Sequence, residues 1–276
     1  MDNEEKISIL SQPPICEIVT KEELKELFET NSNPTHYIGF EISGKVHIGS
    51  GLMNVILINR FLKVGIKPII FLADYHAWIN GKLGGDLKKI QEVAKGYFKS
   101  AFISLGLSED KVTYLLASDI YDNDYWKLVL KISKETTIQR LLRCTTIMGR
   151  SAKEALDGSS IVYPIMQAAD IFLLNVDIAH AGTDQRKVHM LAREIAQKFS
   201  FKKPIALHHS LISGLLGPQK VENEEDDIEI FSKMSKSKPE SCIFIHDSEQ
   251  EIEQKIKNAY CPLKVLDANP IIEICK

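Results

Sequence analysis

The chain has 276 residues, of which 44% are hydrophobic and 26% charged, with a formal net charge of −3. This composition is that of a globular protein, and the charge argues against a protein that coats nucleic acid non-specifically. Five cysteines without a Cys-x-x-Cys pair argue against a disulfide framework or a zinc ribbon. The first ten residues lack a signal-peptide core and no eighteen apolar residues run together, so we expect a cytoplasmic protein without membrane contact.

Strand-like and helical patterns alternate along much of the chain. Four short apolar runs predict buried strands, at residues 36–42, 67–74, 111–117 and 203–209. Residues 52–62 and 86–105 carry apolar side chains three and four apart, which is typical of amphipathic helices. The alternation predicts an α/β fold with a Rossmann-like parallel sheet, whose ligands bind at the carboxyl ends of the strands.

Other segments divide the chain. Residues from about 121 to 160 have a polar helical pattern, which predicts a helical insertion between two halves of the sheet. Residues 217–231 are acidic and nearly without periodicity, so we expect an exposed loop. A helix is predicted at 249–260, and the last residues look like the start of another. We therefore expect an N-terminal extension at 1–20, an α/β domain at 21–245 and the beginning of a helical C-terminal domain at 246–276.

The first candidate site is the strand-to-helix junction "GKVHIGSG". His47, Gly49 and Gly51 stand where free backbone N–H groups and the helix dipole favour anions. Alone, this pattern is as weak as any isolated Gly-x-Gly.

The second candidate is the helix "YPIMQAADIFLL" at 163–174. Pro164 predicts the first turn of that helix, and Tyr163, Gln167 and Asp170 then share one face of an otherwise apolar segment. Buried polar groups cost free energy unless they find partners. The stripe predicts either a structural polar network or, more strongly, a pocket for a small polar ligand.

The third candidate is the segment "HAGTDQRKVHMLAREIAQKF" at 180–199. Thr183 is a candidate N-cap of an amphipathic helix, with Asp184 and Gln185 in its first turn. Gly182 allows a ligand close to the backbone, and Asp184 can accept hydrogen bonds from ribose hydroxyls. Taken alone, ordinary helix capping is the simpler interpretation.

The fourth candidate is the segment "FSKMSKSKPES" at 231–241. Its lysines at 233, 236 and 238 alternate with serines and show no periodicity. Such a loop can close over a triphosphate and neutralise developing charge, although a solvated surface loop has the same composition.

Together the four segments, in this order and spacing, resemble the tyrosyl-tRNA synthetases of the archaeal and eukaryotic type. These are class I aminoacyl-tRNA synthetases with His-Ile-Gly-His and Lys-Met-Ser-Lys-Ser signatures. The resemblance runs from about residue 20 to the C-terminus and includes "LADYHAWIN" and "NAYCP". It implies a class I catalytic domain at 21–245, a signature loop at about 217–241, and the beginning of an anticodon-binding domain at 246–276.

The resemblance implies a tyrosine site. Tyr37 and Asp170 would meet the phenolic hydroxyl, and Tyr163, Gln167 and Gln185 would hold the α-ammonium group. The presence of both Tyr37 and Asp170 favours tyrosine over tryptophan as substrate.

It also implies an ATP site. Gly182 and Asp184 would meet the adenosine, and the phosphates would be surrounded by His47, Gly49, Ser50, Lys233 and Lys236. Of these, His47, Lys233 and Lys236 are the implied catalytic residues, with Mg²⁺ accompanying ATP and no metal-binding residue assigned. The tyrosine carboxylate would attack the α-phosphorus of ATP, and the adenylate would then esterify the terminal ribose of tRNA(Tyr).

Two features depart from the family pattern. Ser50 replaces the second signature histidine, so we expect altered rather than lost handling of ATP. Family members continue beyond "NPIIEICK" into a domain that reads the anticodon, so we expect weakened tRNA charging with tyrosine activation intact.

The family also implies a homodimer formed through the helical insertion. Four basic residues there are candidates for contact with the tRNA acceptor stem, or equally for a solvated helix face: Arg140, Arg143, Arg150 and Lys153. Three alternatives stay open: an adenylyltransferase of similar fold, a tryptophan-specific relative, and a catalytically impaired paralog that acts as a binding module.

Overall fold

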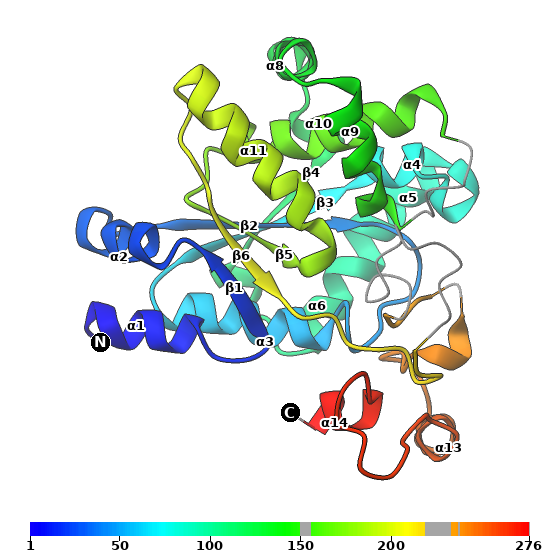
Figure 1. Cartoon of the computed structure of the whole chain (residues 1–276). Helices are drawn as coiled ribbons and strands as arrows, with labels where there is room; N and C mark the ends of the chain where they lie inside the picture. Colours follow the sequence, from blue (N-terminus) through cyan, green and yellow to red (C-terminus); the bar gives the residue numbers. More distant parts are fainter. Residues whose placement is uncertain (150–155, 219–232, 237, 276) are drawn as a thin grey trace.

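A six-stranded sheet forms the centre of the protein in this computed structural model, which describes residues 1–149, 156–218, 233–236 and 238–275 (Figure 1). The strand order is β1-β6-β5-β2-β3-β4, with β1 antiparallel to β6 and the other neighbours parallel. The strands are β1 Ile15–Val19, β2 Thr35–Glu41, β3 Lys67–Ala73, β4 Thr113–Leu116, β5 Ile178–Gly182 and β6 Ile205–His209. The predicted fold class is therefore confirmed.

The chain order reverses beside β2. The next strand, β3, pairs with β2 on one side, whereas β5 pairs with it on the other. A crevice opens at the carboxyl ends of the strands at such a reversal, and ligands bind there in α/β folds. The last residues of β2, β5 and β6, which are Glu41, Gly182 and His209, therefore lie at the edge where a site is expected.

Helices cover both faces of the sheet (Figure 1). The alternation of side chains along β2 sends Ile38 and Phe40 into a core with α3 and the α5–α6 segment. Tyr37 points to the opposite face, into a core with α10 and α11. The helices nearest the sheet are α3 Leu52–Lys63, α4 Asp74–Ile79, α5 Leu87–Val93, α6 Lys99–Ser104, α10 Gly158–Leu173 and α11 Arg186–Phe199.

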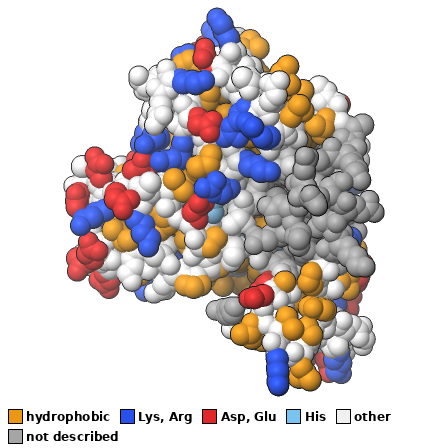
Figure 2. Space-filling view, viewed as in Figure 1, with side chains coloured by type: hydrophobic (Ala, Val, Ile, Leu, Met, Phe, Trp, Pro, Cys, Tyr) orange, Lys and Arg blue, Asp and Glu red, His pale blue; other side chains and the backbone are white. Residues whose placement is uncertain are grey.

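The remaining helices lie around this centre. Residues 121–160, as far as they are described, are largely helical as predicted. The C-terminal segment carries two short helices, as expected, and apolar side chains gather on its surface (Figure 2). These outer helices are α1 Asn3–Leu10, α2 Lys21–Thr30, α7 Ala117–Ile120, α8 Asn123–Lys134, α9 Ile138–Cys144, α13 Glu249–Lys257 and α14 Pro270–Cys275. Within the described residues, no helix is both long and apolar enough to cross a membrane.

Two strands and two helix boundaries differ from the predictions. The strands β1 and β5 were not predicted. The predicted position of Pro164 is wrong, because α10 begins at Gly158, where the Asp157 side chain accepts a hydrogen bond from the Ser160 amide. Thr183 is not an N-cap either, because residues 183–185 form a 3₁₀ turn and α11 begins at Arg186.

The helix predicted at 86–105 is present as α5 and α6, joined by a π-helical turn at Ala94–Phe98. Most of the loop predicted at 217–231 lies outside the described residues.

Candidate active site

A cavity of about 700 Å³ opens at the carboxyl ends of β2, β5 and β6. All twelve residues that the sequence nominated for tyrosine and ATP contribute to its lining: Tyr37, His47, Gly49, Ser50, Tyr163, Gln167, Asp170, Gly182, Asp184, Gln185, Lys233 and Lys236. They come from segments up to 199 positions apart in the chain, so the fold gathers them into one site.

The buried end of the cavity is built around Asp170 of α10. Its Oδ1 accepts hydrogen bonds from the hydroxyls of Tyr121 at 2.5 Å and Tyr125 at 3.0 Å. Its Oδ2 is buried and has no hydrogen-bond partner among the described residues; His76 Nε2 lies 3.7 Å away. Burial raises the pKa of Asp170 to about 8. An unpaired carboxyl oxygen in this position is a ready partner for a ligand hydroxyl.

Tyr37 completes this end of the cavity. Its side chain is buried, and burial together with the nearby Asp170 raises its pKa well above the usual tyrosine range, so the hydroxyl keeps its proton. A Cβ at Gly39 would lie 2.5 Å from the Tyr37 hydroxyl. Glycine at this position therefore leaves room for the ring to lie along β2.

Sequence reasoning missed two tyrosines and one histidine here. Tyr121 and Tyr125 lie in the segment interpreted only as polar and helical, and His76 lies in the segment "LADYHAWIN", to which no site role was given. The signal was partial: a carboxylate in an apolar helix needs donors and tyrosine hydroxyls are donors, but the sequence did not place those of Tyr121 and Tyr125 beside it.

A second polar group lies nearer the mouth. The Tyr163 hydroxyl donates to Glu41 Oε1 at 3.2 Å. Gln167 Nε2 donates to Gln185 Oε1 at 3.2 Å, and Gln185 Nε2 donates to the Ile147 carbonyl at 3.0 Å. Tyr163, Gln167, Gln185 and Glu41 all line the cavity, and their oxygen atoms are acceptors suited to an ammonium group. Sequence reasoning missed Glu41, although an acidic residue that ends a buried strand was a usable signal.

The third part of the cavity lies beside β5. A Cβ at Gly182 would lie 2.6 Å from Asp184 Oδ1 and 2.7 Å from Leu211 Cδ2, so a larger residue here would displace both side chains. Asp184 forms an ion pair with Lys233. Burial acts to raise the pKa of Asp184, but Lys233 outweighs it and holds that pKa below its ordinary value. Asp184 is therefore an ionised acceptor beside the Gly182 backbone that lines the cavity.

The His47 turn faces these groups. The Ser50 amide donates to His47 Nδ1 at 3.4 Å, and the His47 amide donates to Ser50 Oγ at 3.3 Å. Burial, and to a smaller extent Lys236 and Lys233, lowers the pKa of His47 to about 3. The neutral ring therefore has its Nε2–H left to donate to a ligand.

Lys236 approaches the same turn from the signature loop. Its Nζ donates to Ser43 Oγ at 2.9 Å, and burial lowers its pKa to about 8. Cations, an N–H donor and a helix N-terminus thus face one space, which is the arrangement that binds phosphate.

One short segment holds both loops in place. The Ile48 amide donates to the Ile243 carbonyl at 3.0 Å, and the Ile245 amide donates to the Val46 carbonyl at 3.1 Å, so residues 243–245 pair with the His47 turn. Just before them, Ser241 Oγ donates to the Lys238 carbonyl at 2.7 Å and contacts the Ser235 carbonyl at 3.3 Å. Hydrogen bonds through residues 241–245 therefore link the His47 turn to the signature loop that carries Lys236.

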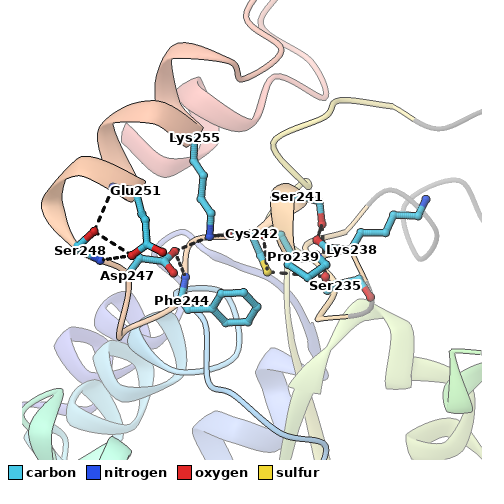
Figure 3. Close-up of polar contacts among 10 residues, drawn as sticks. All are labelled: Ser235, Lys238, Pro239, Ser241, Cys242, Phe244, Asp247, Ser248, Glu251 and Lys255. Atoms are coloured by element: carbon cyan, nitrogen blue, oxygen red, sulfur yellow. Dashed lines mark hydrogen bonds and ion pairs between the residues drawn. The ribbon is translucent and has the colours of Figure 1, made fainter.

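Lys255 of α13 anchors this segment from behind. Its Nζ donates to the Cys242 carbonyl at 3.0 Å and to Asp247 Oδ2 at 2.6 Å, as Figure 3 shows. It also lies 4.9 Å from the centre of the Phe244 ring. The capping box between Ser248 and Glu251 fixes the start of the helix that carries it.

The basic residues of the helical insertion lie elsewhere. Arg140 forms an ion pair with Glu194 at 2.8 Å and, with Arg143, lines a separate hollow of about 220 Å³. Arg150 and Lys153 lie outside the described residues.

Comparison with known proteins identifies close relatives. Residues 29–269 match the family model of the class I tRNA synthetases for tryptophan and tyrosine. The tyrosine–tRNA ligases of Thermococcus sibiricus and Pyrococcus furiosus are each 48% identical over 99% of this chain and 78% of their own. Among solved structures, the tyrosyl-tRNA synthetase of Pyrococcus horikoshii complexed with L-tyrosine has a TM-score of 0.91, with 48% identity over 99% of this chain and 78% of that one. The tryptophanyl enzyme of Aeropyrum pernix, at 20% identity and a TM-score of 0.69 over 92% of this chain and 68% of that one, shares the fold.

Proposed function

The chain belongs to the class I tRNA synthetases for tryptophan and tyrosine, and we propose that it is a tyrosine–tRNA ligase. It activates tyrosine with ATP to tyrosyl-adenylate and transfers the tyrosyl group to tRNA(Tyr). The observation that carries this assignment is the buried end of the cavity, where Asp170 Oδ2 awaits a hydroxyl beside Tyr37. Tryptophan has no hydroxyl to offer there. The catalytically impaired paralog is not favoured, because Lys233 and Lys236 line the cavity.

In this proposal, tyrosine lies along α10. Its phenolic hydroxyl meets Asp170 and Tyr37, and its α-ammonium group meets Tyr163, Gln167 and Gln185. Glu41, which accepts from Tyr163 and forms an ion pair with Lys82 at 3.4 Å, adds a carboxylate to the lining of the same cavity. A pocket that hydrogen-bonds a hydroxyl rejects an analogue without one, and tyrosyl-tRNA synthetases acting against phenylalanine are the established example of that rule.

ATP would occupy the mouth of the cavity. Gly182 and Asp184 receive the adenosine, with Asp184 on the ribose, while His47, Gly49, Ser50, Lys233 and Lys236 surround the phosphates. Lys233 pairs with Asp184 in the structure, so it exchanges this carboxylate for phosphate oxygens when ATP binds. We assign Mg²⁺ to the phosphates of ATP, whose oxygen atoms are the ligands that this ion prefers.

Activation needs no strong general base, since the tyrosine carboxylate is already ionised at neutral pH. Its oxygen forms a bond to the α-phosphorus, and the bond to pyrophosphate breaks. His47 and the two lysines stabilise charge on the phosphates. Holding the two substrates in line can lower the barrier by about 7–11 kcal/mol. In the second step, a hydroxyl of the terminal ribose of tRNA attacks the adenylate carbonyl and AMP leaves.

We place the catalytic domain at 21–245, since all the nominated site residues fall within it, and we expect the enzyme in the cytoplasm with its tRNA. We also propose a homodimer through the helical insertion. Large apolar side chains are exposed on α8 and α9, at Trp126, Leu130, Ile138 and Leu142. Each helix places its two residues four positions apart, on one exposed face. Exposed apolar faces of this kind are characteristic of interfaces.

ATP–pyrophosphate exchange with tyrosine, tryptophan and phenylalanine tests the proposal. We expect exchange with tyrosine alone, abolished in Lys236→Ala. Lys257→Ala is the matched control, since Lys257 forms only an exposed pair with Glu253. Exchange with tryptophan, or none with tyrosine at saturating ATP, would contradict the assignment.

A further inference from the structure

Three buried histidines form a hydrogen-bonded row across the sheet. His36 Nε2 of β2 lies 3.1 Å from His180 Nδ1 of β5, and His180 Nε2 lies 2.9 Å from His209 Nδ1 of β6. All three side chains are at most 4% exposed. The activation mechanism above uses none of them.

One end of this row reaches the cavity. His209 lines it, and since its Nδ1 is occupied by His180, its Nε2 is the nitrogen left for a ligand. That Nε2 lies 3.5 Å from the point where a Cβ on Gly182 would stand, and Asp184 Oδ1 lies 2.6 Å from the same point. His209 Nε2 and the Asp184 carboxylate therefore flank one small space.

The other end of the row lies in the core. His36 Nδ1 is buried and has no hydrogen-bond partner among the described residues. The ring of His36 packs instead against Phe61, with 4.1 Å between ring centres.

The tautomers of the three histidines depend on one another because all three rings are neutral. Burial lowers the pKa of His36 to about 3 and that of His209 to about 4, and it lowers the pKa of His180 well below the usual value. A neutral ring has one N–H and one acceptor nitrogen, so each ring fixes the tautomer of the next. The protons lie either on every Nε2 or on every Nδ1.

Both ends favour the Nε2 arrangement. The Asp184 carboxylate attracts an N–H rather than a lone pair at His209 Nε2. The opposite arrangement would bury an unpaired N–H of His36 in the core, where orphaned donors are rare. The row therefore presents an N–H donor beside an ionised acceptor.

We propose that His209 Nε2–H donates a hydrogen bond to a ribose hydroxyl of ATP, and that the same hydroxyl donates to Asp184. A hydroxyl has one donor hydrogen and two acceptor lone pairs, so the carboxylate accepts its hydrogen and the neutral imidazole N–H donates to one lone pair. His180 and His36 are positioning residues that hold the His209 tautomer. This inference rests on the proposed function, because it needs the ribose beside Asp184.

The test combines variants of His209 with analogues of ATP in tyrosine-dependent exchange. We expect His209→Leu to raise KM for ATP by about 2- to 12-fold, the usual worth of one hydrogen bond, with KM for tyrosine changed less than twofold. His209→Gln, which keeps a side-chain N–H, should recover most of the loss. With either 2′-deoxy-ATP or 3′-deoxy-ATP, whichever lacks the contacted hydroxyl, the native and His209→Leu proteins should differ less than twofold.

His189→Leu is the matched control. His189 is equally buried, pairs with His208 at 3.0 Å and does not line the cavity, so its replacement should leave KM for ATP unchanged. If His209→Leu raised KM for ATP equally with ATP and with both deoxy analogues, the hydroxyl contact would be refuted. Exchange by the native protein separates this result from a failure of the proposed function itself.

Nitrogen NMR of the native protein gives a second test that needs no variant to fold. Imidazole ¹⁵N shifts and couplings distinguish the two neutral tautomers. A proton on Nε2 of His209 at pH 7 is the expected result, and a proton on Nδ1 would overturn the proposal.

Discussion

A single buried carboxyl group, that of Asp170, sets the chemistry at the closed end of the cavity. Two tyrosine hydroxyls satisfy one of its oxygens, and the other has no partner among the described residues. The sequence predicted that Asp170 needs partners, because a carboxylate in an apolar helix must find them. It did not predict Tyr121 and Tyr125 as those partners, since they come from the end of α7 and the first turn of α8, which only the tertiary fold places there.

Asp170→Asn tests the environment of this carboxyl through the pH dependence of stability. Its pKa is about 8 in the folded protein and near 3.8 when unfolded. The folded state therefore binds the proton more tightly than the unfolded state does. The stabilisation that this proton gives the native protein is complete below pH 4 and is lost as the pH rises toward 8. Asparagine cannot ionise, and its Oδ1 still accepts from the two tyrosines.

Urea unfolding of both proteins without tyrosine measures this difference. Relative to the native protein, the free energy of unfolding of the variant should increase by up to about 1.4 kcal/mol per pH unit between pH 5 and 8. Above pH 8 the difference should stay constant. Other titrating groups are the same in both proteins and cancel. A difference between the two that did not vary with pH would mean that Asp170 ionises normally.

Ser50 is the second residue whose effect can be measured. Its side chain and amide close the turn onto His47, but its hydroxyl is too short to reach as far as an imidazole would. Ser50→His adds a donor at the phosphates, so we expect KM for ATP to fall by about 2- to 10-fold in exchange. Ser50→Ala removes the turn contact without adding a donor and should raise that KM. Equal KM values in all three proteins would exclude a role for position 50 in ATP binding.

At the scale of elements, strong periodic patterns were predictive and weak ones were not. The four apolar strands occur within two residues of their predicted limits. β5 was missed because "IAHAG" is short and made largely of alanine and glycine, which do not favour a strand. β1 was missed because a register shift between Ile15 and Glu17 breaks the two-residue alternation that marks a strand.

The link between α13 and the two signature loops could not be predicted, because it depends on contacts across the fold. Lys255 holds the Cys242 carbonyl and the largely buried Asp247, which would otherwise lack its cation. Removing one partner of such a pair leaves the other unsatisfied, at a cost of about 1–3 kcal/mol. The loosened segment would then hold His47 and Lys236 less accurately.

Lys255→Met should therefore lower kcat of exchange by about 3- to 10-fold, which is about 0.7–1.4 kcal/mol and so only a part of that cost. KM for tyrosine should change less than twofold, because the tyrosine end of the cavity is formed by α10 and β2. Lys257→Met is the control, since its pair with Glu253 on the same helix is exposed and contributes little. Equal losses in both variants would show a general effect on α13 rather than a link to the loops.

At the scale of the whole molecule, the fold brings the twelve residues that the family resemblance nominated into the lining of one cavity. Most of them follow the carboxyl ends of β2 and β5 or lie on α10 beside those ends, where α/β folds place ligands, whereas Tyr37 lies within β2 and the signature loop supplies Lys233 and Lys236. Residues such as Glu41 and His209 also lie at those ends, but one sequence does not say which end residues face the cavity. That depends on the register between strands, such as the pairing of Gly182 with His209.

The surface of the helical insertion leads to the last prediction. Leu130 on α8 and Leu142 on α9 are 69% and 43% exposed, and Trp126 and Ile138 extend the same helix faces. In a symmetric dimer each interface residue is present in both subunits, so one substitution removes two contacts. Burial of each leucine contributes about 1.5–3 kcal/mol to the free energy of association. Leu130→Lys should therefore weaken dimerisation by at least about 100-fold.

Sedimentation equilibrium should find the native protein at twice its chain mass of 31.1 kDa and Leu130→Lys at 31.1 kDa. Leu263→Lys provides the control, because Leu263 is 94% exposed but belongs to the C-terminal segment rather than to the insertion. If Leu263→Lys dissociated the protein and Leu130→Lys did not, the interface would lie at that segment. The exposed apolar faces of α8 and α9 would then not form the dimer interface.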